Sequence, residues 1–253
     1  MKETITVNLK EDIGVLNKPI MVVGLPGVGH IGKFAADYLA EYLEAEPIID
    51  IISPHFPPQV LINEDSTISI MKNMICVAKT EKNDIVFLIG DNQSTSPQGH
   101  YELCDIYSDI AINLGVERIY TLGGYPIPML SEPQVIGVAT TTDIFEKLKE
   151  AGVEIRPSEP SGGIAGTSGL LLAFAQHKGI EAACLMGTTT GYIVDIKCSK
   201  VVLNVLGKII GIDIPEDALN EKIEEMEKIA EQFKREPPEE FESQMEDDLA
   251  YFG

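Results

Sequence analysis

The stretch PIMVVGLPGVGHIGKFAADYLAEYL, residues 19–43, joins an apolar run to an amphipathic segment through a glycine-rich turn. Gly27, Gly29 and Gly32 spell G-x-G-x-x-G, which between a strand and a helix is the phosphate-binding pattern of dinucleotide-binding domains. Lys33, directly after Gly32, nearly completes the P-loop pattern as well. The same residues therefore fit two nucleotide-binding motifs and also a plain strand-to-helix turn.

The plain turn is the favoured interpretation of this glycine-rich loop. Phe34 stands where a P-loop carries the hydroxyl that holds Mg²⁺. Asp50 ends the second predicted strand near a ribose-binding position, but no downstream residues suggest hydride transfer. Glycine by itself permits a sharp turn and close packing of a helix on a sheet. A nucleotide- or nucleoside-binding enzyme that uses the loop of residues 27–32 stays the alternative function.

Charge and composition exclude several classes of protein. The chain of 253 residues has 40 acidic and 19 basic side chains, a formal net charge of -21, which argues against nucleic-acid or anionic-membrane partners. The cysteines and histidines are scattered without metal-ligand spacing, which indicates buried, reduced thiols and no metal site. No apolar run reaches the roughly 20 residues that span a bilayer, and the first residues are too polar for a signal peptide. We therefore expect a soluble cytoplasmic protein without a metal or cofactor.

Short Val- and Ile-rich runs alternate with amphipathic stretches from Pro19 onward, the pattern of βα units around a mostly parallel or mixed sheet flanked by helices. The strands are predicted at residues 20–23, 48–52, 85–89, 119–122, 135–139 and 182–186, and one helix at 98–114. Three helices are predicted to end at a glycine, namely Gly115, Gly152 and Gly179. Residues 66–80 are predicted to form a hairpin that turns at Lys72 and Asn73 and adds antiparallel strands at the sheet edge.

The sequence divides into an α/β domain over residues 1–212, an amphipathic helix over 213–235 and a flexible acidic tail over 236–253. Pro215 is placed to begin the helix. Apolar residues at spacings of four and three form one stripe along it, namely Leu219, Ile223, Met226, Ala230 and Phe233. We expect this stripe to pack on the domain or on a sister subunit. From Asp213 to the end there are 15 acidic and 4 basic side chains, a net charge of 4 − 15 = −11. A segment of such charge cannot bury enough apolar area to order itself.

Candidate catalytic residues do not combine into a site. Ser168 lies in GTSGL, which lacks the G-x-S-x-G spacing of a nucleophile elbow. The glycine-rich segment 161–166 opens a helix whose exposed amides are able to bind an anion. Asp195 is placed to cap the following helix rather than to act as a base. We predict no catalytic residue.

The loop motifs taken together resemble the PAC2 family, the proteasome assembly chaperones and their archaeal homologues. The motifs follow in order: GLPGVGHIGKFAADYL, PHFPPQV, GDNQSTSPQGHYEL, LGGYPIP, GGIAGTSGLLLAFA and GTTTGYIVD. The likeness runs from about Pro19 to Ile212. It implies an α/β domain similar to the purine nucleoside phosphorylase architecture, without enzymatic activity. It also implies an ATP-independent chaperone whose partners are proteasome α-subunits in the α-ring.

The resemblance also implies a binding segment at the chain end. Archaeal members that act on proteasomes carry a hydrophobic residue, then Tyr or Phe, then any terminal residue, and Tyr251, Phe252 and Gly253 match this pattern. Phe252 replaces the commoner Tyr, so that one hydrogen bond is lost. The terminal carboxylate is suited to pair with a lysine between α-subunits while the aromatic rings are buried. Because one flexible tail binds weakly, we expect a homo-oligomer, with or without a paralogous chain, that presents several tails.

Overall fold

The computed structural model describes residues 1–129, 132–160, 162–191, 194–216 and 219–220. Its elements in chain order are β1 (Ile5–Asn8), β2 (Ile20–Gly24), the short 3-10 helix η1 (Val28–His30), α1 (Ile31–Tyr42), β3 (Glu46–Ile52), β4 (Val60–Ile62), β5 (Ile68–Ile70), β6 (Asn73–Ala78), β7 (Ile85–Gly90), α2 (Pro97–Asn113), β8 (Arg118–Pro126), β9 (Val135–Ala139), α3 (Phe145–Glu150), α4 (Thr167–His177), β10 (Glu181–Thr189) and α5 (Ile196–Ile210).

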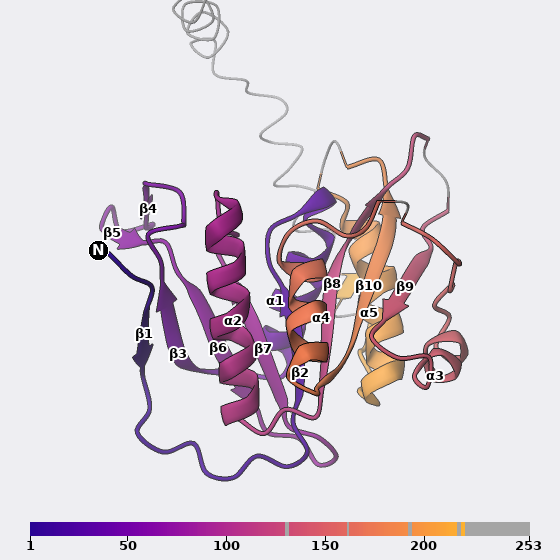
Figure 1. The fold of residues 1–253 in the computed structure, drawn as a ribbon, viewed down its shortest axis with the longest axis horizontal. Coiled ribbons are helices and arrows are strands. Elements are labelled where there is room, and N and C mark those ends of the chain that lie inside the picture. Colours follow the sequence, from indigo (N-terminus) through magenta and orange to yellow (C-terminus); the bar gives the residue numbers. More distant parts are fainter. Residues whose placement is uncertain (130–131, 161, 192–193, 217–218, 221–253) are drawn as a thin grey trace, which may run out of the picture. The chain divides into compact units, whose positions relative to one another are not determined.

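Most strands join one eight-stranded mixed sheet with the order β1-β3-β6-β7-β2-β8-β10-β9 (Figure 1). The central strands β7, β2, β8 and β10 are mutually parallel, whereas β6 and β9 run antiparallel to their neighbours. All residues of β2 are buried, as expected for a parallel strand that is covered on both faces. The predicted α/β fold with a mixed sheet and flanking helices is therefore confirmed.

Helices form a layer on each face of this sheet. α2 and α4 pack together on one face, and α1 and α5 pack together on the other (Figure 1). Side chains of β2 alternate between the two layers, so Met21 and Val23 join the buried cluster that contains Leu103 and Tyr107 of α2 and Leu171 of α4. The sheet is consequently filled on both faces in its centre.

Two glycines set how closely α1 approaches the sheet. A methyl group at Gly32 would lie 2.2 Å from the carbonyl oxygen of Leu122 in β8, and one at Gly24 would lie 2.2 Å from the carbonyl oxygen of Gly32. Real side chains do not make contacts of this length. Gly32 is therefore required by helix-on-sheet packing. Gly27, in contrast, has extended backbone and no atom nearer than 3.7 Å to its missing methyl position.

The predicted strands and helix ends are confirmed. Val135–Ala139 has the predicted bounds, and the other predicted strands each form the core of an observed strand. Gly115, Gly152 and Gly179 all adopt positive φ at the ends of α2, α3 and α4, where glycine is the residue that tolerates this conformation.

The hairpin prediction for residues 66–80 is wrong in its pairing. β5 pairs with β4 in a separate sheet, and β6 is antiparallel to β3 and β7 as expected. β6 lies inside the large sheet, however, and not at its edge, which is formed by β1 and β9. Lys72 stands between β5 and β6, where its Nζ contacts Asp50 at 2.7 Å and its N–H contacts Asp91 at 3.1 Å. These contacts direct β6 into the sheet rather than back onto β5. β1 and β4 were not predicted from the sequence.

The chain divides after Asp213. Beyond it the structure describes Ile214–Glu216, Leu219 and Asn220, and the N–H of Leu219 donates to the carbonyl oxygen of Pro215 at 3.3 Å. Most of the predicted helix over 213–235 and all of the predicted tail over 236–253 lie outside the described residues. Within the described part, no helix has the length and apolarity that a bilayer crossing requires.

The different surroundings of Gly32 and Gly27 give a direct test. We expect Gly32→Ala to lower the free energy of unfolding by about 1–3 kcal/mol, because the new methyl group overlaps the Leu122 backbone. Gly27→Ala is the matched control, and its expected change is below about 0.5 kcal/mol. Urea unfolding of both variants measures the difference. Equal effects of the two substitutions would contradict the packing role of Gly32.

Candidate functional site

The loops that carry the sequence motifs meet at one edge of the eight-stranded sheet. Five of the six motifs lie at the carboxyl ends of β2, β3, β7, β8 and β10, which all point in the same direction. The sixth motif begins before α4, and its residues Ile164 and Ala165 line one cavity together with Gly27 of the loop after β2. This edge is where ligands bind in open α/β sheets. The motifs, although separated in sequence, are therefore gathered in one place.

Gln93, in the loop after β7, links three of these loops through its side-chain amide. Its Nε2 donates to the carbonyl oxygen of Pro26 at 2.7 Å, and its Oε1 accepts from the N–H of Thr167 at 2.8 Å. Thr167 is the first residue of α4, and the preceding Gly166 makes no side-chain cap. One of the amides that the sequence offered to an anion is thus bound by the protein itself.

A cavity of about 130 Å³ lies between these loops. None of its lining side chains is charged, and its polar side chains are Gln93, Ser168 and Cys184. Burial raises the pKa of Cys184 to about 11, so its sulfur is a neutral thiol at pH 7. Ser168 Oγ donates to the carbonyl oxygen of Leu122 at 3.3 Å rather than to a base. Sites for small ligands usually measure about 300–1,000 Å³, so this cavity is too small for a nucleotide.

Lys33 and Asp50, which suggested nucleotide binding in the sequence, both contact other residues of the protein. Lys33 Nζ contacts the Asp37 carboxylate at 2.8 Å and the Gly90 carbonyl oxygen at 3.0 Å. Asp50 lies on β3 beside Lys72, and β6 and β7 separate β3 from β2. In a dinucleotide-binding fold these first two strands are neighbours. The geometry therefore favours the structural interpretation of the glycine turn.

Asp195 has the role that the sequence predicted. It is the N-cap of α5, where its Oδ1 accepts from the N–H of Cys198 at 3.0 Å. The cysteines of the chain, Cys76, Cys104, Cys184 and Cys198, are all buried and free. Among the described residues, no group of three or more His, Cys, Asp or Glu side chains is arranged to hold a metal ion.

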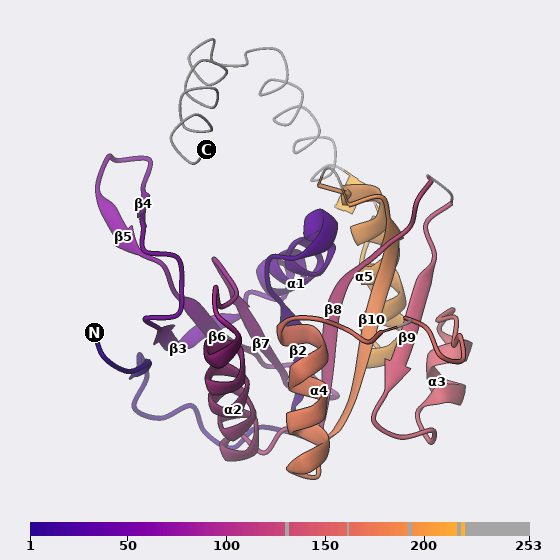
Figure 2. The same cartoon turned by 45° about the horizontal axis from the view of Figure 1, so that its top comes forward.

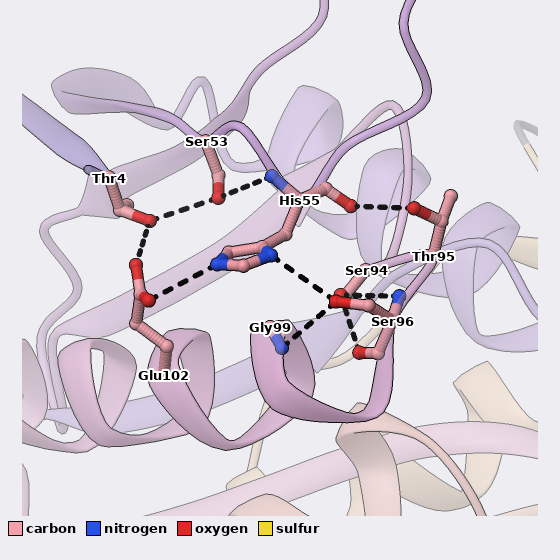
Figure 3. Close-up of polar contacts among 8 residues, drawn as sticks. All are labelled: Thr4, Ser53, His55, Ser94, Thr95, Ser96, Gly99 and Glu102. Carbon is pink, nitrogen blue, oxygen red and sulfur yellow. Dashed lines mark hydrogen bonds and ion pairs between the residues drawn. The ribbon is translucent and has the colours of Figure 1, made fainter. Parts of the chain in front are cut away.

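A closed hydrogen-bond network beside this edge was missed by the sequence reasoning (Figure 3). The N–H of His55 donates to the Ser53 hydroxyl at 3.1 Å, and the Ser53 and Thr4 hydroxyls are 2.9 Å apart. The Thr4 hydroxyl in turn donates to Oε1 of Glu102 at 2.5 Å. Glu102 Oε2 then returns to Nε2 of His55 at 3.1 Å. Ser96, the N-cap of α2, contacts Nδ1 of the same ring at 3.2 Å.

The direction of each hydrogen bond in this network follows from one acceptor. An ionised carboxylate only accepts, so Glu102 requires that Nε2 of His55 carries a proton. In the neutral ring Nδ1 is then the acceptor, and the Ser96 hydroxyl donates to it while Ser96 Oγ accepts from the N–H of Gly99 at 3.1 Å. Thr4 likewise donates to Glu102 and accepts from Ser53. The network fixes the ring of His55 against α2 and the start of the chain.

The order serine, histidine, carboxylate also occurs in hydrolases, but here its geometry serves the fold. Ser96 Oγ is committed to the start of α2 through Gly99. A methyl group at Gly99 would lie 2.3 Å from the His55 ring, so the ring packs directly on the helix. The one available signal in the sequence was Ser96-Pro97, a typical helix start. It gave no indication that Thr4 and His55 approach the same helix.

The predicted partner-binding residues lie elsewhere. Tyr251, Phe252 and Gly253 are outside the described residues, so the structure does not test their role. Of the residues considered from the sequence, those at the sheet edge have roles in packing and capping.

A family model described as the PAC2 family matches residues 21–234. A protein of Methanocaldococcus jannaschii, named uncharacterized protein MJ1210, is 36% identical over 264 residues, which cover 100% of this chain and 99% of that protein.

Solved structures agree over nearly the whole length. Pyrococcus furiosus PbaB, described as an archaeal proteasome activator, has a TM-score of 0.82 and 36% identity and covers 92% of this chain and 100% of PbaB. Pyrococcus furiosus PbaA in its monoclinic form is described as an archaeal homolog of proteasome-assembly chaperone. Its TM-score is 0.74 and its identity 26%, with 99% of this chain and 96% of PbaA covered.

The network around Glu102 predicts a pH dependence of stability. The hydrogen bond from Thr4 lowers the pKa of Glu102, and the contact with His55 lowers it further, whereas partial burial acts to raise it. A lowered pKa stabilises the folded state above the ordinary carboxyl pKa, and this contribution is lost as the pH falls through the folded value. Because the Glu102 side chain is 37% exposed, we expect a contribution of no more than about 1 kcal/mol.

Glu102→Gln tests this contribution. We expect the variant to be less stable than the wild type at pH 7, and the difference to shrink as the pH is lowered below the carboxyl range, as measured by urea unfolding at several pH values. Glu150→Gln, on the exposed end of α3, is the matched control for loss of one carboxylate. A difference for Glu102→Gln that stays constant with pH would contradict the assignment.

Proposed function

The chain belongs to the PAC2 family, and from this membership we propose that it is a cytoplasmic, ATP-independent proteasome assembly chaperone that binds α-subunits through its C-terminal residues. One observation carries the proposal: two proteins with proteasome functions in their descriptions, PbaB and PbaA, cover 92% and 99% of the chain. The cavity at the sheet edge is small and its lining side chains are uncharged, and we propose no enzymatic step there.

The chemistry of the chain end supports this mode of binding. Tyr251 and Phe252 offer two aromatic rings for burial, and Gly253 brings a free carboxylate beside them. Such a segment suits a narrow apolar pocket with a lysine at its mouth, as a cleft between α-subunits would provide. The acidic residues that precede the end repel one another and keep the segment in water until it binds.

A second function is favoured by a specific comparison. PbaB, described as an archaeal proteasome activator, is 36% identical to the chain, whereas PbaA is 26% identical. Activation of the finished particle would use the same tail and the same α-ring. Two different assays distinguish these functions. A chaperone speeds the assembly of free α-subunits, and an activator speeds peptide hydrolysis by purified, assembled proteasomes.

Removal of Tyr251, Phe252 and Gly253 tests the tail mechanism. Because buried aromatic anchors contribute about 2 kcal/mol or more each, we expect the loss of both Tyr251 and Phe252 to weaken binding to immobilised α-rings by about a thousandfold, or to abolish it. Glu239→Gln/Glu240→Gln is the control, since it changes the same acidic segment away from the end and should retain binding. Equal capture of the full and truncated chains would remove this mechanism.

The departure from tyrosine at position 252 gives a finer test. Phe252→Tyr restores a hydroxyl, and one net hydrogen bond of about 0.5–1.5 kcal/mol should tighten binding to α-rings by about 2- to 12-fold. Tyr251→Phe removes a hydroxyl from the neighbouring position and should leave the affinity nearly unchanged. Affinities are measured by surface plasmon resonance on immobilised rings. The reverse pattern would place the chain end in the pocket in a different register.

A further inference from the structure

The hairpin formed by β4 and β5 stands away from the eight-stranded sheet (Figure 2). Among the described residues, its two strands pair only with each other. Residues that lie opposite one another share a face, and one face of the hairpin is apolar: Val60, Ile62, Ile68 and Ile70. Their exposed fractions are 50%, 79%, 69% and 51%, in that order. The apolar face is therefore formed and largely in water.

The turn of the hairpin determines which backbone groups of β5 point outward. The N–H of Asn63 donates to the carbonyl oxygen of Thr67 at 2.8 Å, so these two residues are a hydrogen-bonded pair next to the turn. Hydrogen-bonded and non-hydrogen-bonded pairs alternate along an antiparallel ladder, so Ile68 is in a non-hydrogen-bonded pair, and so is Ile70. The N–H and C=O groups of Ile68 and Ile70 consequently point away from β4, and no other described strand pairs with them.

The free edge of β5 has none of the residues that usually protect an edge strand. Folded proteins block such edges with proline, with charged side chains or with a bulge. The residues of β5 and the next one, Ile-Ser-Ile-Met, include neither proline nor a charge. Pro57 and Pro58, in contrast, lie just before β4. The edge of β5 is therefore the better template for an added strand.

An apolar pocket of about 500 Å³ adjoins the apolar face at the end of the hairpin away from the turn. Val60 and Ile70 belong to its lining together with Phe56, Pro57 and Met71. No side chain of the lining is charged, and the volume is within the usual range of about 300–1,000 Å³ for ligand pockets. The pocket therefore suits a large apolar side chain of a strand that is added to β5.

The turn end of the same face is acidic. Glu64 and Asp65 occupy the turn, and within the described part of the chain neither carboxylate is in an ion pair. Hydrogen bonds from the hydroxyl and the N–H of Thr67, at 2.6 and 3.0 Å, lower the pKa of Asp65 and keep it ionised. A basic residue of a partner complements this turn. A second copy of the chain does not, because it brings the same carboxylates and a net charge of -21.

We propose that the free edge of β5 binds an extended segment of another protein, which adds to the hairpin as an antiparallel third strand. Because it is antiparallel to β5, the segment runs from the pocket toward the turn. It carries a large apolar residue for the pocket and then β-branched residues opposite Ile70 and Ile68. A lysine or arginine follows beside Glu64 and Asp65. Main-chain hydrogen bonds give affinity in this mode of binding, and side-chain pockets give specificity.

The inference goes beyond the proposed function, since it rests on residues 56–71 and on no C-terminal residue. Its probe is a synthetic peptide with the stated pattern, SFTVTVTKK with an N-terminal fluorescein, and fluorescence anisotropy with the full chain at low ionic strength measures the affinity. The scrambled peptide TKVSTFKTV has the same composition and charge without the alternation, so we expect it to bind about tenfold more weakly or not at all. A wild-type chain that does not bind SFTVTVTKK, as when another copy covers the face, overturns the proposal.

Ile68→Pro and Ile62→Pro are a matched pair of variants. The two residues are opposite each other, and each has an outward N–H, so proline at either position removes no hydrogen bond between β4 and β5. We expect Ile68→Pro to weaken the binding of SFTVTVTKK about tenfold or more, because the edge of β5 loses a donor, and Ile62→Pro to weaken it no more than about threefold. Equal effects of the two substitutions overturn the proposal.

Glu64→Lys tests the acidic turn. Because exposed ion pairs contribute modestly, we expect this variant to bind SFTVTVTKK about two- to fivefold more weakly and the acidic peptide SFTVTVTEE more tightly by a similar factor. Glu150→Lys, at an exposed position on α3, is the matched control for net charge and should change both affinities less. Identical responses of the two variants contradict the placement of the basic residues beside the turn and overturn the proposal.

Hydrogen exchange tests the same contact without a substitution, which is needed if the proline variants do not fold. In the complex of wild type with SFTVTVTKK, the amides of Ile68 and Ile70 donate to the peptide, so their exchange should become slower. The outward amides of Val60 and Ile62, on the edge of β4, should be slowed less. Unchanged exchange over residues 68–70 in the presence of saturating peptide overturns the proposal.

Discussion

The contact between α1 and the backbone of the central strands is the constraint on which the other features depend. Only a hydrogen atom fits between the Cα of Gly32 and the Leu122 carbonyl oxygen, and because Gly32 has no side chain, α1 packs directly against β8. The turn before α1 is thereby pressed against the neighbouring loops, and Asp195 donates its N–H to the Gly29 carbonyl oxygen at 2.9 Å. Gly32 of the motif that resembles a phosphate cradle is used for packing, and the cavity at this sheet edge measures only about 130 Å³.

Local patterns predicted what depends on local physics. Gly115 and Gly179 follow helices and adopt the left-handed conformation because glycine alone does so at little cost. β2 was recognisable because a strand covered on both faces is apolar throughout. Strand partners were not predictable in this way. The composition of β6 allows several neighbours, and its place is set by distant contacts such as that of Asn73 with Tyr107 at 2.8 Å.

The His55 network shows the same limit at the level of a site. Its members come from the start of the chain, the loop after β3 and the first turns of α2, and no spacing in the sequence relates these segments (Figure 3). Each bond is individually ordinary. The specificity comes from closure, because a carboxylate that only accepts determines the proton on His55 and through it the role of Ser96. A closed network of this kind depends on how distant segments meet in the folded chain, so it could not be predicted from the sequence.

Function in this fold must be argued from surfaces, because the same α/β layers serve many unrelated activities. On a chain of net charge -21, attraction to an acidic or like-charged surface is weak, and apolar segments without charge determine where contact forms. The exposed apolar side chains on β4 and β5 form one such segment: Val60, Ile62, Ile68 and Ile70.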